Sequence, residues 1–290
     1  MPTFHTPGPI AVTLELGVGD VRIDATDRTD TTVEVRPSDP TETSDVSAAE
    51  QTRVEYSNGH LLVKAPSSWR RWASRKGASI DVEIGLPVGS RLDVEAGVLT
   101  LRASGPIGET RGSLGVGDIH LDATGPIELK SGAGDISVER AAGKAVITAG
   151  SGGVRLRTVD GPAVVKNGNG ATWIGEVTGE ARVSAANGDI SIDVARAGVL
   201  AKTANGGVRL GEVSIGSAVA ETAFGDLDVG VRDGVAAWLD LHTRFGHVRN
   251  DLDATAAPGN DEGSVDVRAS TSYGDISIHR SFAGAGRDAS

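Results

Sequence analysis

Residues 189–206 read DISIDVARAGVLAKTANG, and this 18-residue unit, preceded by Gly188, returns in recognisable form along most of the chain. Ile190 and Ile192 alternate with polar residues, which is the pattern of a half-buried strand. A second alternating segment follows at Val199–Lys202, and Asn205-Gly206 supplies residues that tolerate a tight turn. Neither half has the spacing of an amphipathic helix, so one unit is predicted to be two short strands joined by turns.

The Gly-Asp pair that opens each unit recurs at a nearly constant interval. Copies followed by an alternating apolar pair begin at Gly19-Asp20, Gly117-Asp118, Gly134-Asp135, Gly188-Asp189, Gly225-Asp226 and Gly274-Asp275, with weaker copies between them. From Asp118 to Asp226 the successive copies are 17 to 19 residues apart. A fixed short period is typical of stacked-repeat proteins.

Equivalent strands at this interval can pair in parallel if the chain winds one coil per repeat. Because parallel crossovers are almost always right-handed, we predict an all-β, right-handed parallel β-solenoid with about 18 residues per coil. A meandering antiparallel β-roll or sandwich is the alternative, but it does not need a constant interval. In the solenoid, Arg155 should lie beside Trp173 and Arg209 beside Asp228, and the inward column should continue from Leu227 through Val248 to Ile276.

We expect one β-solenoid domain over residues 1–282. The repeat is interrupted by an insertion at 38–78 and by a loop at 254–263, which is rich in Ala, Pro, Gly and acidic residues. Residues 283–290 are expected to form a flexible tail.

The insertion itself contains recognisable local signals. Residues Ser44 to Gln51 could form a short helix with Ser44 as its cap. Two strand-like segments, Arg53–Tyr56 and Leu61–Lys64, flank the sequence Ser57-Asn58-Gly59-His60, which is a hairpin signal.

Composition excludes several classes of function. The chain has 290 residues, a formal charge of −11 and no Cys. The acidic charge disfavours general nucleic-acid binding, and the lack of Cys excludes disulfides, thiolate metal sites and thiol catalysis. Residues 1–10 do not resemble a secretory signal, and no apolar run reaches 18 residues. These features lead us to expect a cytoplasmic protein.

The repeated Asp is the first candidate for chemistry. Carboxylates aligned along one edge of a solenoid could bind Ca²⁺ or act as paired acids in a glycan-cleaving β-helix. The simpler interpretation is that each Asp accepts backbone N–H groups at its own turn. Gly153, Ala171 and Gly207 interrupt the column, and the sequence contains no phosphate-binding loop, HExxH or G-x-S-x-G motif. We therefore expect no metal, no cofactor and no catalytic residue.

One local cluster differs from the rest of the chain. Trp69, Arg70, Arg71 and Trp72 are followed by Arg75 and Lys76, so cations and large aromatics gather within an acidic protein. Such a cluster can dock a partner or contact anionic lipid headgroups. Alternatively, its rings could fold back over an open solenoid end, because solenoids need covered terminal coils.

Four stretches of the sequence carry a family resemblance. They are VTLELGVGDVRIDATDRTDTTVEVRPSD (12–39), SIDVEIGLPVGSRLDVEAG (79–97), the serial Gly-Asp repeats, and AAWLDLHTRFGHVRNDL (236–252) followed by STSYGDISIHR (270–280). In order and spacing the chain resembles the bacterial putative-adhesin family, a β-strand-repeat domain of unknown function common in actinobacteria. The resemblance implies a β-solenoid and carries no active site with it.

These observations favour a non-enzymatic interaction or scaffold module whose partners are proteins. Two alternatives stay open. One is a carbohydrate-active enzyme of the β-helix type with carboxylates in a lateral groove. The other is an envelope-stress or membrane-associated sensor that docks through residues 66–77.

Overall fold

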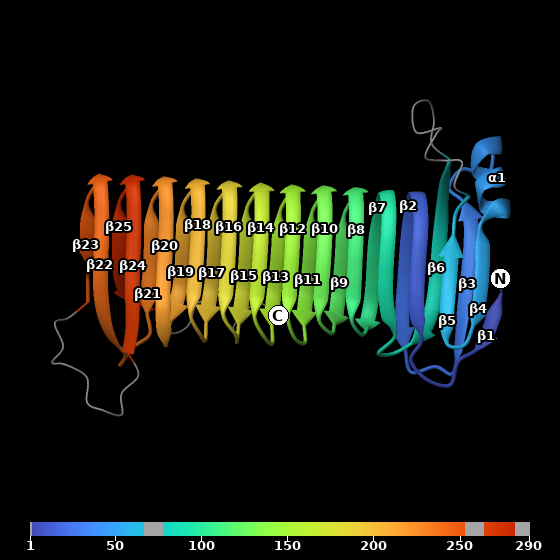
Figure 1. Ribbon diagram of the computed structural model, residues 1–290, viewed down its shortest axis with the longest axis horizontal. Helices are drawn as coiled ribbons and strands as arrows, with labels where there is room; N and C mark the ends of the chain where they lie inside the picture. Colours follow the sequence, from blue (N-terminus) through green and yellow to red (C-terminus); the bar gives the residue numbers. More distant parts are fainter. Residues whose placement is uncertain (1, 67–77, 253–263, 282–290) are drawn as a thin grey trace. The chain divides into compact units, whose positions relative to one another are not determined.

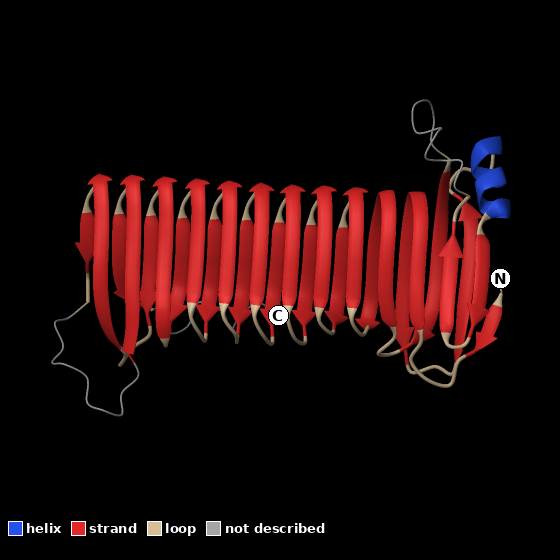
Figure 2. Cartoon of the chain, in the orientation of Figure 1, coloured by secondary structure: helices blue, strands red, loops and turns tan. Residues whose placement is uncertain are grey.

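The computed structural model describes residues 2–66, 78–252 and 264–281, and it consists almost wholly of β-strands (Figure 2). The chain divides into two compact units, unit 1 over residues 1–152 and unit 2 over residues 153–290. Each unit is described by itself. Among the described residues the helical structure is a nine-residue segment of unit 1, α1 (Thr43–Gln51).

Unit 2 is built from two sheets of parallel strands, and in Figure 1 one sheet lies in front of the other. In spatial order the first sheet contains β13 (Val154–Val159), β15 (Thr172–Val177), β17 (Ile190–Ala195), β19 (Val208–Val213), β21 (Leu227–Val231), β25 (Ile276–Arg280) and β23 (Val248–Asn250). The second contains β14 (Ala163–Asn169), β16 (Ala181–Asn187), β18 (Val199–Asn205), β20 (Gly216–Phe224), β24 (Ser264–Tyr273) and β22 (Ala236–Phe245).

The strand register confirms the coil length predicted from the repeat. Thr172 pairs with Ile190, and Ile190 pairs with Val208, so residues 18 apart occupy equivalent places in neighbouring coils. Each coil contributes one strand to each sheet. The fold is therefore an all-β parallel solenoid, because a meander would pair strands that are adjacent in sequence.

Side-chain directions in unit 2 follow the predicted alternation. Ile190 and Ile192 are each 1% exposed, and Arg209 pairs with Asp228 across the strands, with Nε 3.7 Å from Oδ2. The Arg155 guanidinium carbon lies 4.2 Å from the centroid of the Trp173 ring. Both predicted neighbour pairs are confirmed, since they depend only on residues 18 or 19 apart lying in adjacent coils.

The order of the last two coils differs from the prediction. Ile276 pairs with Leu227 on one side and with Val248 on the other. The final strands β24 and β25 therefore lie between the coil of β20 and β21 and the coil of β22 and β23. Val248 is 47% exposed and does not continue the buried column. The expected order was wrong because Leu227, Val248 and Ile276 are all apolar, and chain order alone does not decide which of these coils lies between the other two.

Unit 1 also has two sheets, and its two long strands bend from one sheet into the other. These are β2 (Ala11–Thr26) and β7 (Arg91–Pro106). Beyond β7 the regular coils contain β8 (Thr110–Val116), β9 (Ile119–Thr124), β10 (Ile127–Ala133), β11 (Ile136–Ala141) and β12 (Ala145–Ser151). On the other side of β2 lies an outermost coil made of β5 (His60–Lys64) and β6 (Ser79–Pro87). The segment expected as an insertion thus supplies half of a coil.

Antiparallel strands cover the outermost coil of unit 1. β3 (Asp30–Pro37) pairs with β6, β1 (Thr3–His5) pairs with β3, and β4 (Arg53–Ser57) pairs with β5. The rings of Phe4 in β1 and Tyr56 in β4 lie 5.2 Å apart. Helix α1 contacts β3 and β6. As a result Ile80 and Ile84 of β6 are each only 2% exposed.

The local signals of this covering layer are partly confirmed. β4 and β5 form a hairpin whose central residues, Asn58 and Gly59, both have positive φ, 50° and 76°, as a two-residue hairpin turn requires. The helix, however, begins one residue before the expected start. Its N-cap is Glu42, which makes no side-chain capping hydrogen bond. Ser44 lies inside the helix, where its hydroxyl donates to Asp45 at 3.4 Å, so its predicted role as cap was wrong.

Candidate binding surfaces

The repeated Asp residues connect neighbouring coils. Asp118 Oδ1 accepts the backbone N–H of Asp135 at 2.8 Å, and Asp189 Oδ1 accepts that of Gly207 at 2.7 Å. In unit 2, Asp226 likewise accepts the N–H of Asp275 at 2.8 Å. Each carboxylate therefore accepts an N–H group of the next coil, where the sequence had led us to expect one of its own turn. The Asp column is engaged in stacking the coils.

The Gly before each Asp is required by the closeness of this stacking. Gly188 has φ +135°, and a Cβ built on it would lie 2.2 Å from the carbonyl oxygen of Gly170 in the neighbouring coil. Gly206, which precedes Gly207 in a weaker copy, has φ +140°, and a Cβ built on it would lie 2.4 Å from the carbonyl oxygen of Gly188. Real Cβ atoms do not approach so closely, and L side chains disfavour this backbone conformation. The Gly-Asp motif is thus explained by coil stacking.

A row of charged side chains crosses the outer face of unit 1. Alternation along the strands points Arg22 of β2, Glu83 of β6 and Arg102 of β7 outward, and the strand register places these three side by side. His120 of β9 is opposite Arg102 in the register. The row therefore brings residues from four strands, far apart in sequence, onto one surface.

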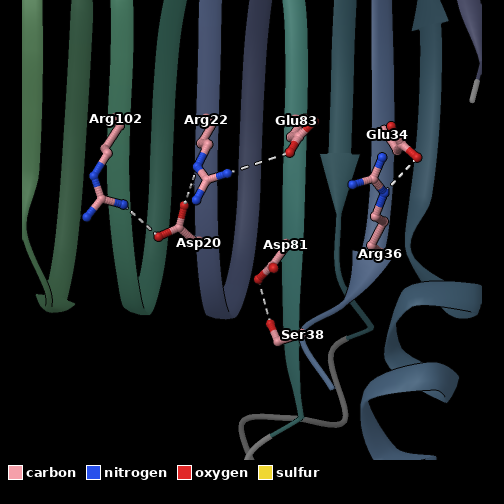
Figure 3. Close-up of polar contacts among 8 residues, drawn as sticks. All are labelled: Asp20, Arg22, Glu34, Arg36, Ser38, Asp81, Glu83 and Arg102. Carbon is pink, nitrogen blue, oxygen red and sulfur yellow. Dashed lines mark hydrogen bonds and ion pairs between the residues drawn. The ribbon is translucent and has the colours of Figure 1, made fainter. Parts of the chain in front are cut away.

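Ion pairs connect the members of this row, as Figure 3 shows. Arg102 Nη1 donates to Asp20 Oδ2 at 2.8 Å, and Arg22 Nε lies 3.5 Å from Asp20 Oδ1. Arg22 Nη1 is 3.8 Å from Glu83 Oε1. Arg36 on β3 donates to Glu34 at 2.7 Å, and this hydrogen bond raises the pKa of the Arg36 guanidinium.

Beside the row the surface is hollowed into a shallow groove of about 640 Å³. Its lining includes Arg22, Asp24, Glu83, Arg102, His120 and Asp122. Exposed ion pairs contribute little to stability, so they can exchange for the polar groups of a ligand at small cost. The groove is therefore suited to binding a polar ligand.

A second surface in unit 2 is a column of stacked aromatic rings. The rings of Phe224 and Tyr273 are 5.0 Å apart and within 3° of parallel, and Phe245 stacks on Tyr273 at 4.8 Å. The side chains of Phe224, Tyr273 and Phe245 all point to solvent, with exposed fractions of 54%, 48% and 57%. Because they occupy equivalent positions of adjacent coils, their spacing is set by the solenoid. We call these three residues the aromatic column.

An asparagine ladder precedes the aromatic column at the same position of earlier coils. Asn187 donates to Asn169 and Asn205 donates to Asn187, each at 2.8 Å, and Asn205 is opposite Phe224 in the register. The aromatic column was not predicted from the sequence. The available signal was the residue immediately before the repeated Gly, which changes from Asn in 187–188 and 205–206 to an aromatic at Phe224, Phe245 and Tyr273.

The binding residues expected from the sequence, Trp69, Arg70, Arg71 and Trp72, lie outside the described residues. Over the ranges that are described, no group of three or more His, Cys, Asp or Glu side chains is arranged to hold a metal ion. In the same ranges no helix has the length and apolar character needed to cross a membrane.

Parallel coils joined by Gly-Asp turns define this chain as a β-solenoid repeat protein. It belongs to the toastrack DUF4097 family, whose model matches residues 11–288. No curated protein matches the chain.

Solved structures with detectable similarity include three bacterial proteins. A putative adhesin from Parabacteroides merdae is 10% identical, with a TM-score of 0.40 and coverage of 96% of this chain and 94% of that chain. A putative adhesin from Bacteroides fragilis is also 10% identical, with a TM-score of 0.36 and coverage of 96% and 95%. A putative cell adhesion protein from Clostridium sporogenes is 13% identical, with a TM-score of 0.23 and coverage of 96% and 98%.

Proposed function

We propose that this protein is a non-enzymatic interaction and scaffold module that binds a protein partner through the aromatic column. The observation that carries this proposal is the stacking of Phe224, Tyr273 and Phe245 in a row that faces solvent. Exposed clusters of large apolar side chains mark interaction sites on soluble proteins. Aromatic residues also dominate the energetic centres of protein interfaces.

Composition strengthens the argument. The chain has four Phe and two Tyr, and three of these six residues stand together in the aromatic column. Each ring is held by the coil beneath it and by its stacked neighbour, so little side-chain entropy remains to be lost when a partner binds. The row of rings is thus preorganised for binding.

The geometry also indicates the chemistry of the partner. Stacked rings present their edges to solvent, and their faces are largely occupied by one another. Edges pack well against aliphatic and proline side chains of a protein surface. The formal charge of −11 favours a partner whose surface is neutral or basic.

The test is a quantitative pull-down with the purified chain as bait. The double variant Phe224→Ser/Tyr273→Ser should lose its specific partner while its thermal melt stays close to that of the wild type, because both side chains lie outside the core. The control is Ile215→Ser, which removes another apolar side chain that is 59% exposed but stands outside the column. If the double variant keeps every partner that Ile215→Ser keeps, the column is not the binding surface.

The non-enzymatic part of the proposal has its own test. The groove of unit 1 carries carboxylates from different strands, as a glycan-cleaving β-helix would require. We expect no release of reducing ends from a panel of polysaccharides. Hydrolysis that is present in the wild type and lost in Glu83→Gln would replace our proposal with the carbohydrate-active enzyme considered in the sequence analysis.

The cationic cluster Trp69, Arg70, Arg71 and Trp72 remains a second proposed contact, either with a protein or with an anionic membrane surface. Replacing all four residues by Ser should weaken sedimentation of the protein with phosphatidylglycerol vesicles if the membrane contact is real. Unchanged sedimentation would exclude that contact. A cytoplasmic location likewise stays a prediction, to be checked by fractionation of cells that express the protein.

A further inference from the structure

The outer edge of unit 2 presents backbone groups and inward side chains that the proposed function does not use. β22 is ten residues long and, within the described residues, pairs only with β24. Its inward side chains are poorly covered, because Leu239 and Leu241 are partly exposed whereas Val267 and Ala269, their partners in β24, are 0% and 1% exposed. A row of backbone N–H and C=O groups and an apolar strip therefore face outward together.

This edge lacks the devices that usually prevent strand addition. Natural edge strands carry Pro, Lys, bulges or inward-pointing charges that block pairing with another chain. β22 reads AAWLDLHTRF and has none of these residues at its inward positions, which are occupied by Ala237, Leu239, Leu241 and Thr243. Its charged residues, Asp240 and Arg244, are both outward. The edge is open to a further strand of suitable sequence.

We propose that this edge is an interface between two copies of the chain, formed by antiparallel pairing of β22 with β22 of the second copy. Homodimers favour twofold symmetry, in which one patch meets itself. A twofold axis normal to the sheets would also bring β23 of one copy to β23 of the other. The aromatic column reaches this edge through Phe245, the last residue of β22, but the inference rests on the unpaired backbone and the inward side chains of β22 and not on the rings.

The sequence of β22 is complementary to itself in one antiparallel register. With His242 opposite His242 of the second copy, Asp240 faces Arg244 of the second copy, and the reciprocal pair forms by symmetry. Cross-strand pairs of opposite charge favour pairing, and like charges oppose it. The same register places inward Leu241 opposite inward Thr243 of the second copy. The inward side chains of β22 in the two copies then bury one another. A shift by one residue would turn these side chains to solvent.

Charge reversal tests both the dimer and its register. In sedimentation equilibrium the wild-type chain should dimerise, and Asp240→Arg or Arg244→Asp should each raise the dimer dissociation constant about tenfold or more, since two attractions become repulsions. The double variant Asp240→Arg/Arg244→Asp should return within about threefold of the wild type. The control Lys202→Glu reverses one member of an exposed ion pair with Glu221, 2.8 Å apart on strands away from the edge, and should change nothing.

A cross-linking measurement checks the register without depending on affinity. The chain has no Cys, so His242→Cys introduces a single thiol opposite its own copy, at a spacing that a disulfide can bridge. Oxidation should give a covalent dimer, whereas Ser191→Cys, an outward position far from the edge, should not.

Three results would overturn the proposal. The first is a wild-type chain that remains monomeric up to about 200 µM, well above the dissociation constants of ordinary dimers. Another chain segment covering the edge would produce that result. The second is a dimer that tolerates both single reversals, which would place the interface elsewhere. The third is failure of the double reversal to restore pairing together with no covalent dimer of His242→Cys, which would exclude this register.

Discussion

The outermost coils of the two units are built alike but end differently. In each unit, the coil that is nearest a chain terminus in sequence lies between two other coils. β2 lies between β6 and β7, and β24 lies between β20 and β22. In unit 1 antiparallel strands and a helix then cover the outermost coil, whereas in unit 2 no described residues pair with the outer edge of β22. Inward residues are consequently buried in β6 and partly exposed in β22.

This difference shows that stacking of repeats does not by itself bury the inward side chains of the outermost coil. Each coil covers the inward side chains of its neighbour, so the outermost coil depends on something that is not a repeat. Unit 1 supplies that cover from its own sequence. We propose that unit 2 obtains it from a second copy.

The largest expected effect separates the two outermost coils directly. Ile84→Asp, in covered β6, buries an unpaired carboxylate where Ile84 is 2% exposed, and should cost about 3–5 kcal/mol of unfolding free energy. At protein concentrations below the dimer dissociation constant, Leu239→Asp in β22 leaves the new carboxylate partly in water and should cost about 1 kcal/mol. Urea denaturation of both variants measures the difference. Equal losses would show that β22 is covered as completely as β6.

A second comparison concerns how far each coil can move. A Cβ on Gly19 would lie 1.9 Å from the carbonyl oxygen of Ile80, and one on Gly246 would lie 2.0 Å from that of Gly274. β6 cannot withdraw because β3 holds it from the other side, so Gly19→Ala should cost about 2–3 kcal/mol. The uncovered coil around Gly246 can shift, and Gly246→Ala should cost about 1 kcal/mol. Thermal melts would contradict this reasoning if Gly246→Ala were the more damaging change.

A third test weakens the attachment of the covering layer. Asp45 in α1 is 7% exposed and accepts the backbone N–H of Ser79 at 3.1 Å and that of Asp39 at 3.2 Å. Asp45→Ala leaves two N–H groups without this acceptor and should cost about 1–2 kcal/mol. Glu50→Ala, on the exposed side of the same helix, should stay within about 0.5 kcal/mol. Hydrogen exchange at β6 should rise in the first variant only.

The smallest effect is a pH dependence at the start of the covering strand β3. Arg28 donates two hydrogen bonds to Asp30, and this contact lowers the pKa of the Asp30 carboxyl below its usual 3.8. Because the folded-state pKa of Asp30 is lowered, its contact with Arg28 contributes its full stability at pH values above the unfolded-state pKa. This stability is lost as the pH falls through the folded-state pKa. Unfolding midpoints of the wild type and Asp30→Asn should therefore converge at acid pH. A difference that stays constant as the pH falls through the range in which carboxyl groups become protonated would exclude this ionisation as the cause.

Much of the fold could be predicted from the sequence because the repeat is written in local chemistry. Alternating apolar pairs specify a strand with one buried face, Gly permits the close turn, and the constant interval selects parallel coils. The neighbour pairs Arg155–Trp173 and Arg209–Asp228 followed from that interval without knowledge of the structure.

The order of the last coils could not be predicted in this way. Val248 and Ile276 are both apolar, and a parallel ladder accepts either as the neighbour of Leu227, although Asn250 stands opposite Ile278 in the register. The candidate surfaces were missed for a related reason. Phe224, Phe245 and Tyr273 are single residues far apart in the chain, and Arg22, Glu83 and Arg102 belong to strands whose adjacency depends on where β2 and β6 lie.

The sequence by itself determined the architecture of one coil, its length of about 18 residues and the direction in which each side chain points, because these depend on short-range backbone preferences and on alternation. Only the tertiary structure decided which coils are neighbours at each end, which outermost coil is covered, and which distant aromatics and charges meet. Those outcomes depend on long-range burial, where several arrangements of similar strands satisfy the same local pattern and the one that covers the most apolar surface is formed.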